Sequence, residues 1–157
     1  MPEPDFDEKL AHRWFAVKAN NLAWPLVEAS TRTAAETSQM IEAAHAAIFH
    51  WSQVGTALNL LRAEVLLATA WQVAGNPKLA MGHAQRALEH AESADSLHTA
   101  FDTATVHGCL TLLMDEAGQI KERDHHEQAC KEALEQLNGA EGPDFIRAQY
   151  LSRLNTS

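Results

Sequence analysis

The break Gly75-Asn76-Pro77 interrupts two alanine-rich stretches that otherwise have the composition of helices. Glycine readily adopts the left-handed conformation found just after a helix, so Gly75 predicts a helix end. Asparagine commonly caps the next helix, and proline fits its first position, where no amide hydrogen is required. A helix that ends and restarts with almost no loop must fold back on its predecessor. The break therefore predicts an antiparallel helical hairpin.

The rest of the chain shows the same alternation of helix formers and short breaks, because 157 residues contain only seven glycines and five prolines. Near the N-terminus, Asp5 with Glu8 and Thr33 with Glu36 resemble capping boxes that start two helices. Pro25 predicts that the first of these helices stops or kinks near Trp24. The helices predicted beyond Gly55 span residues 56–74, 77–94, 96–117, 120–137 and 143–154.

These segments predict a single all-α domain over residues 1–157, because no stretch alternates with period two for long enough to form a strand. Within it we expect an N-terminal helix pair over 1–54, repeat-like hairpins over 56–94 and 96–138, and a capping helix over 143–154. The cap is expected to use four large side chains at helical spacing, Phe145, Ile146, Tyr150 and Leu154.

The formal net charge of −9 favours an acidic surface, which repels phosphate backbones and anionic lipid. We therefore expect neither a nucleic acid nor a membrane as partner. The N-terminal stretch is acidic and polar, so no signal peptide is visible. Two cysteines, Cys109 and Cys130, give no disulfide framework, and the default expectation is a cytoplasmic protein.

The hairpin around Gly75 resembles the tetratricopeptide repeat family. With Ala80 placed on the first signature alanine of the family, the matching positions are Leu67, Ala68, Trp71, Gly75 and Ala87. The positions that depart from the pattern are Glu64, Ala84 and Glu92. A second unit matches only in Leu112, Gly118 and the pair Ala133-Leu134, and its period of roughly 45 residues exceeds the usual 34 or so.

The resemblance implies hairpins stacked into an array whose concave face binds a peptide or a partner protein, with no catalytic residues. A compact six- to seven-helix bundle is the alternative architecture. A short array leaves its apolar ends uncovered, so the N-terminal segment with Trp14, Phe15 and Trp24 is expected to cover one end or to join two chains in a homodimer.

A polar stripe follows one face of the helix predicted over 56–74. It consists of Asn59, Arg62, Thr69 and Gln72. Glu64 lies away from this stripe among apolar residues, and a carboxylate there must be paired, protonated or exposed in a groove. A structural glutamate held by a basic neighbour and a groove-lining residue are both open. Together these five residues are the partner-binding candidates.

Nine histidines are many for this length, and several lie on faces that helices pack against. A zinc site that joins the last two long helices is a weak alternative, through His98, Cys109, His126 and Cys130. Glu42 and His45 have the three-residue spacing of carboxylate-bridged metal bundles, but only one such copy is present. His83 and His126 are expected at helix interfaces, where burial opposes protonation.

No phosphate loop, nucleophile elbow or His-Glu-x-x-His motif is present. The sequence therefore predicts a protein that is not an enzyme, needs no cofactor, and acts as an interaction scaffold that binds a peptide or partner protein. The alternative is a helical domain that binds a small ligand or a metal at a histidine-rich interface.

Overall fold

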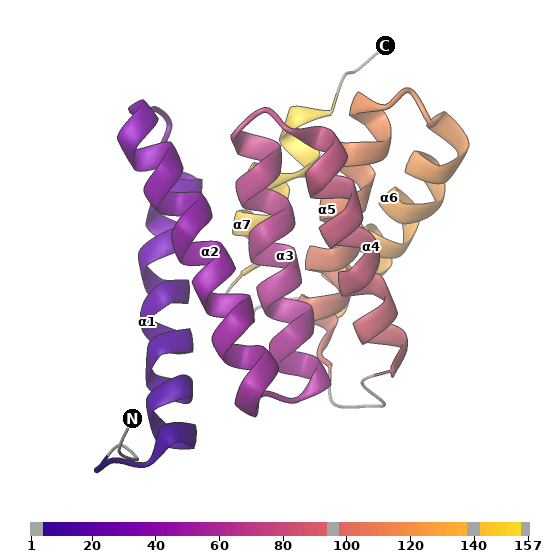
Figure 1. Ribbon diagram of the computed structural model, residues 1–157. Helices are drawn as coiled ribbons and strands as arrows, with labels where there is room; N and C mark the ends of the chain where they lie inside the picture. The colour runs from indigo at the N-terminus through magenta and orange to yellow at the C-terminus, as the bar shows by residue number, and fades with distance from the viewer. Residues whose placement is uncertain (1–4, 94–97, 138–141, 155–157) are drawn as a thin grey trace.

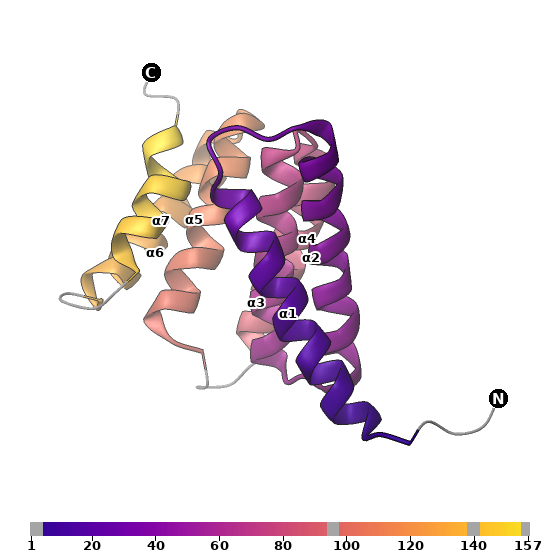
Figure 2. The same cartoon turned by 90° about the vertical axis from the view of Figure 1, so that its left-hand side faces the viewer.

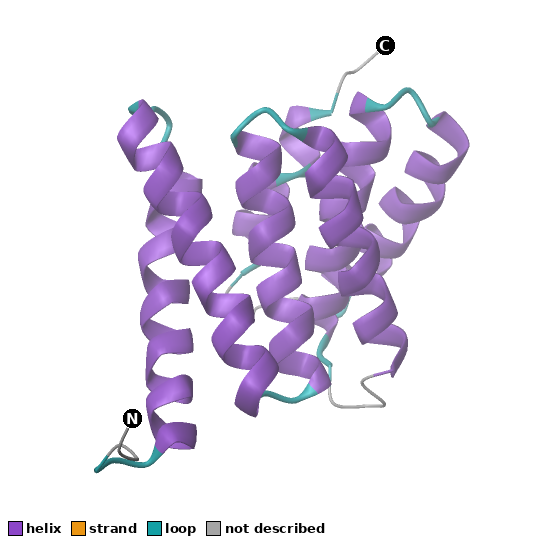
Figure 3. Cartoon of the chain, viewed as in Figure 1, coloured by secondary structure: helices purple, strands orange, loops and turns teal. Residues whose placement is uncertain are grey.

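The computed structural model describes residues 5–93, 98–137 and 142–154, and all regular structure within them is helical (Figure 3). The helices are α1 (Glu8–Glu28), α2 (Ala34–Val54), α3 (Ala57–Val73), α4 (Pro77–Ser93), α5 (Ala100–Glu116), α6 (Ile120–Glu135) and α7 (Pro143–Gln149), followed by the 3₁₀ turn η2 (Leu151–Arg153). The all-α prediction is confirmed.

The six long helices pack as consecutive hairpins, α1 with α2, α3 with α4, and α5 with α6 (Figure 1). Helix α2 packs on α3 and α4 packs on α5, so the hairpins stand side by side in chain order. Helix α1 forms one edge of the array and faces the viewer in Figure 2. None of the helices in the described ranges is long and apolar enough to cross a bilayer.

The break after α3 has the predicted geometry. Gly75 has φ of 79°. Its amide donates to the carbonyl of Gln72, and the amide of Asn76 donates to that of Trp71, which together form a Schellman motif. The Asn76 side chain then accepts the amide of Leu79 at 3.2 Å and caps α4, which begins at Pro77. The end of α3 and the start of α4 are therefore formed by the adjacent residues Gly75, Asn76 and Pro77.

Gly75→Val should lower the free energy of unfolding by about 1 kcal/mol or more, because a β-branched residue is strained at positive φ. A Cβ at Gly75 would meet nothing within 4 Å, so the cost is conformational rather than steric. Chemical denaturation measures it. Gly82→Ala within α4, where a Cβ also has space, is the control and should stabilise by about 0.5–1 kcal/mol. An unchanged stability for Gly75→Val would contradict the stop-and-restart interpretation.

The start and end of α1 differ from the prediction. Asp7, two residues after Asp5, caps the helix and accepts the amide of Leu10 at 3.0 Å. A stop near Trp24 is wrong, because α1 continues through Pro25 to Glu28, while the alternative of a kink there stays a prediction. Arg32 donates to the carbonyls of Leu26, Val27 and Ala29, which satisfies the end of the helix. These bonds and the burial of Val27 hold the last turn in place.

The other helix starts follow the capping pattern closely. The Thr33–Glu36 box is present as predicted. The Thr33 hydroxyl accepts the amide of Glu36, and the Glu36 carboxylate accepts the amide of Thr33. Helix α5 begins at Ala100 rather than at residue 96, because Thr99 and Asp102 form a capping box there. The predicted end of the sixth helix, at residues 138–139, lies outside the described residues, as do residues 96 and 97.

Two apolar clusters form the core, and α3 contributes to both. One joins α3 to α4, α5, α6 and the C-terminal segment, and the other joins α3 to α1 and α2. Many of the fully buried positions are alanines, including Ala44, Ala68, Ala80 and Ala87. Small residues let helix backbones approach closely, which explains how alanine-rich helices pack into tight hairpins.

Candidate functional site

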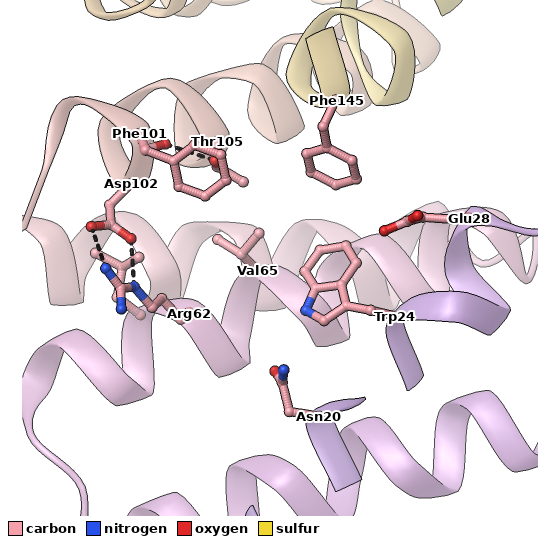
Figure 4. A pocket seen from close by; sticks show the side chains of 10 residues that line it. Asn20, Trp24, Glu28, Arg62, Val65, Phe101, Asp102, Thr105 and Phe145 are labelled. Carbon is pink, nitrogen blue, oxygen red and sulfur yellow. Dashed lines mark hydrogen bonds and ion pairs between the residues drawn. The ribbon is translucent and has the colours of Figure 1, made fainter. Parts of the chain in front are cut away.

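A pocket of about 330 Å³ opens between α1, α3, α5 and α7. Figure 4 shows its lining. The residues are Asn20, Trp24, Glu28, Leu61, Arg62, Val65, Phe101, Asp102, Thr105 and Phe145. Leu61 and Val65 lie one turn apart on α3 and form an apolar floor. The Arg62–Asp102 pair lies at one end and Glu28 at the other, so an apolar cavity is bounded by charges at both ends.

Aromatic rings from three helices form the walls of this pocket. Trp24 of α1 and Phe145 of α7 meet edge to face, with ring centroids 5.5 Å apart. Phe101 of α5 lies on the same side as Phe145 (Figure 4). All three rings are partly exposed, so a ligand could contact them without rearrangement of the core. Apolar walls with a few polar groups are typical of ligand pockets.

The Arg62–Asp102 pair is the charged feature of the pocket. Nε of Arg62 donates to one carboxylate oxygen of Asp102 at 2.7 Å, and one Nη donates to the other at 3.0 Å. Asp102 is 1% exposed, whereas half of the Arg62 side chain is exposed. Burial alone raises the pKa of Asp102, but hydrogen bonds from Arg62 and Thr99 outweigh it, and the pKa is lowered. Asp102 therefore holds Arg62 in one orientation.

The C-terminal segment closes one side of the pocket and covers part of α3. The Tyr150 hydroxyl lies 2.9 Å from the Thr69 hydroxyl, and Arg153 donates to the Gln72 side chain at 3.1 Å. Tyr150 and Ile146 are buried, and a Cβ on Gly108 of α5 would lie 3.0 Å from the Tyr150 ring. The sequence favours a cap on one end of the array, while the structure places this segment across α5 and α3.

The polar stripe predicted on α3 divides into three kinds of contact. Asn59 caps its own helix by accepting the amide of Thr56. Thr69 and Gln72 are buried, and Gln72 also donates to Glu116 at 2.7 Å. Of the four, only Arg62 lines the pocket. The polar side chains of the stripe therefore have hydrogen-bond partners in the C-terminal segment, in α5 and in the helix cap.

Glu64 lies on the other side of α3, against α4. It is 6% exposed, and its two oxygens lie 2.6 Å from Nδ1 of His83 and 3.0 Å from Nε of Arg86. Burial alone raises the pKa of Glu64, but the bonds from His83 and Arg86 outweigh it, so the pKa is lowered. This arrangement corresponds to the structural alternative, a buried glutamate held by basic neighbours.

The four residues of the weak zinc alternative divide between the core and a second concavity. Cys109 and Cys130 are free and buried, and burial raises the pKa of their thiols to about 12 and about 11. Cys130 donates to the Ala104 carbonyl at 3.3 Å. His98 and His126 line a different concavity, between α4, α5 and α6. In the described ranges, no three His, Cys, Asp or Glu residues are placed to hold a metal ion.

A histidine-lined concavity of about 410 Å³ lies between α4, α5 and α6. The imidazoles that line it belong to His98, His107, His125 and His126. The Nδ1 atoms of His107 and His126 lie 2.9 Å apart. Burial, and then the neighbouring His126 and His125, lower the pKa of His107 to about 4. His107 and His125 were not among the predicted candidates, because their convergence depends on how the helices pack.

Of the residues that line the pocket, only Arg62 was a predicted candidate, and those missed include Asn20, Trp24, Glu28, Phe101 and Phe145. Trp24 was assigned to an array end or a dimer contact, and Phe145 to the cap. The spacing of Thr99 and Asp102 is a local signal that Asp102 belongs to a capping box. No local signal indicates that Asp102 also pairs with Arg62, which lies forty positions earlier.

Comparisons of the chain with protein-family models, with curated proteins and with solved structures gave no match. The tetratricopeptide likeness therefore remains a resemblance in sequence pattern, beside an architecture of stacked helical hairpins.

Proposed function

We propose that this protein is a non-enzymatic interaction scaffold that binds a peptide segment of a partner protein in the pocket between α1, α3, α5 and α7. The observation that supports the proposal is the pocket itself, with three aromatic walls and an oriented arginine. Two free buried thiols agree with a reducing compartment such as the cytoplasm.

The chemistry of the pocket suggests how a peptide would bind. An apolar side chain fits between Trp24, Phe101 and Phe145 above the floor of Val65. Asp102 occupies Nε and one Nη of Arg62, while the other Nη has no partner within the described residues. That group can donate to a peptide carbonyl or carboxylate. The preferred ligand is therefore an extended segment in which an apolar anchor precedes or follows a hydrogen-bond acceptor.

Arg62→Gln should weaken peptide binding by about tenfold, because it removes a charge-assisted donor from the pocket. The probe is a peptide selected from a random phage-displayed library against the purified protein, and fluorescence anisotropy measures its Kd. Arg86→Gln is the matched control, since Arg86 is also half exposed and also pairs with a buried carboxylate, on the opposite side of α3. It should leave the Kd unchanged.

A second pair of variants separates pocket occupancy from charge. Asn20→Trp places an indole at the pocket and should abolish binding, whereas Asn21→Trp, on the exposed face of α1, should not. Selected peptides that bind all four variants equally would contradict the proposed site.

The alternative function, a small ligand or metal bound at a histidine-rich interface, has one supporting observation. Four imidazoles line a single concavity. Metal analysis of the dialysed protein distinguishes the two proposals. A peptide scaffold retains no metal, whereas near-stoichiometric zinc that is lost in His107→Gln would favour the alternative.

A further inference from the structure

Helix α1 carries a row of large apolar side chains that no other part of the described chain covers. Phe6, just before the helix, is 64% exposed, and Leu10, Trp14 and Val17 are 65%, 54% and 43% exposed. Leu10, Trp14 and Val17 are spaced four and three residues apart and lie on one face of the helix, and Phe6 precedes them outside it. We call these four side chains the α1 stripe. Trp24, one of the residues expected at this end of the array, lines the pocket instead.

The exposed surface continues from α1 onto α2. Trp14 packs edge to face on Phe15, whose ring stacks on His50 of α2. Phe49 lies next to His50 and is 57% exposed. The stripe alone exposes roughly 450 Å², since a large side chain presents roughly 150–250 Å². A stable interface needs about 800 Å² from each partner, which the stripe, Phe15, Phe49 and their polar rim can supply.

We propose that the α1 stripe is the interface of a homodimer in which the α1 helices of two copies pack antiparallel. A two-fold axis makes this surface self-complementary, so that Leu10 of each copy meets Trp14 of the other. Helix α1 forms one edge of the array (Figure 2), and the dimer would cover that edge. The apolar end of a short helical array needs such a cover.

The charges along α1 select the antiparallel orientation. Acidic residues predominate at its start, where Asp5, Asp7 and Glu8 outnumber Lys9, and the basic residues Arg13 and Lys18 follow. Lys18 extends over the Trp14 ring, with Nζ 5.2 Å from the centroid, so it borders the stripe. An antiparallel pair brings Lys18 of each copy to the acidic start of the other, whereas a parallel pair brings like charges together.

A second copy suits this surface better than a membrane does. The acidic residues at the start of the stripe and the net charge of −9 both oppose contact with anionic lipid. The basic residues are too few to reverse that balance. Binding to vesicles is therefore an outcome that would contradict the proposal.

Sedimentation equilibrium tests the interface in the full chain. The wild type should be dimeric, and Trp14→Glu should weaken the dimer by more than about a hundredfold, because the contact occurs twice. Ile120→Glu is the matched control, since Ile120 is an apolar residue of α6 with 50% exposure, and it should leave the dimer intact. A monomeric wild type, or a dimer that tolerates Trp14→Glu, would overturn the proposal.

A charge exchange tests the orientation. Lys18→Glu and Asp5→Lys should each weaken the dimer by about five- to tenfold, and the double variant should recover most of the loss, since each pair occurs twice. Additive losses would contradict the antiparallel register. Cosedimentation of the wild type with phosphatidylserine vesicles would show that the stripe is a membrane surface. Trp14→Glu should retain the Kd for pocket-selected peptides, so this test is independent of the proposed function.

Discussion

Tyr150→Ala should lower the free energy of unfolding by about 3–5 kcal/mol, the usual cost of deleting a buried aromatic side chain. Tyr150 is 1% exposed and packs against Gly108 of α5, and its hydroxyl lies 2.9 Å from that of Thr69. Burial, and then the neighbouring Cys109, raise the pKa of this phenol well above 10, so the neutral hydroxyl is the form that bonds Thr69. Urea denaturation of the two proteins measures the difference.

Tyr150→Phe separates the hydroxyl from the ring. It should cost only about 1 kcal/mol, because Thr69 still donates to the Val65 carbonyl at 2.8 Å. Leu154→Ala, further along the same segment and only partly buried, is a comparison for a peripheral position, and its cost should be smaller than that of Tyr150→Ala. A Tyr150→Ala variant as stable as the wild type would mean that the C-terminal segment does not pack on α5 and α3 in solution.

The C-terminal segment also shows where sequence reasoning reached its limit. Helical spacing predicted an amphipathic element near residues 143–154, and that much depends only on local pattern. Which surface it covers depends on long-range packing. Thr69 and Gln72 look like solvent-facing polar residues in the sequence, but Tyr150 and Arg153, some eighty positions away, provide them with hydrogen-bond partners.

Local signals were reliable where the physics is local. The left-handed Gly75, the Asn76 cap and the Thr33–Glu36 box each involve residues within a few positions of one another. The helix does not stop at Pro25, because the penalty of a proline inside a helix is offset by tertiary packing and by the Arg32 cap. The pocket could not be predicted, because its walls come from four helices distant in sequence.

The protein should lose stability as the pH falls from about 7.5 to about 5.5, and His107 should be a main cause. Its folded pKa of about 4 lies below the ordinary histidine value, because burial and the adjacent His126 and His125 disfavour the imidazolium. The unfolded chain therefore binds a proton near pH 6.5 that the folded chain does not bind until about pH 4. The loss begins near pH 6.5 and is complete near pH 4.

Other histidines act in the same direction. Burial and the neighbouring His125 lower the pKa of His126, and burial and His12 lower that of His50. His107 alone accounts for about 1–1.5 kcal/mol between pH 7.5 and 5.5 by linkage. The direction agrees with the sequence-based expectation for His126, and it adds His107, which that expectation did not include.

Unfolding free energies measured by urea denaturation at the two pH values test this account. His107→Gln should remove most of the pH dependence attributed to His107, and His126→Gln should reduce it as well, because the Nδ1 atoms of the two rings lie 2.9 Å apart and share one site. His83→Gln is the comparison. The sequence predicts that it also reduces the dependence of stability on pH, but the Nδ1 of His83 lies 2.6 Å from the Glu64 carboxylate in a different helix pair. Equal free energies of unfolding at both pH values would show that the histidines between α5 and α6 are as accessible to water in the folded state as in the unfolded state. That result would contradict the desolvation of His107 on which the prediction depends.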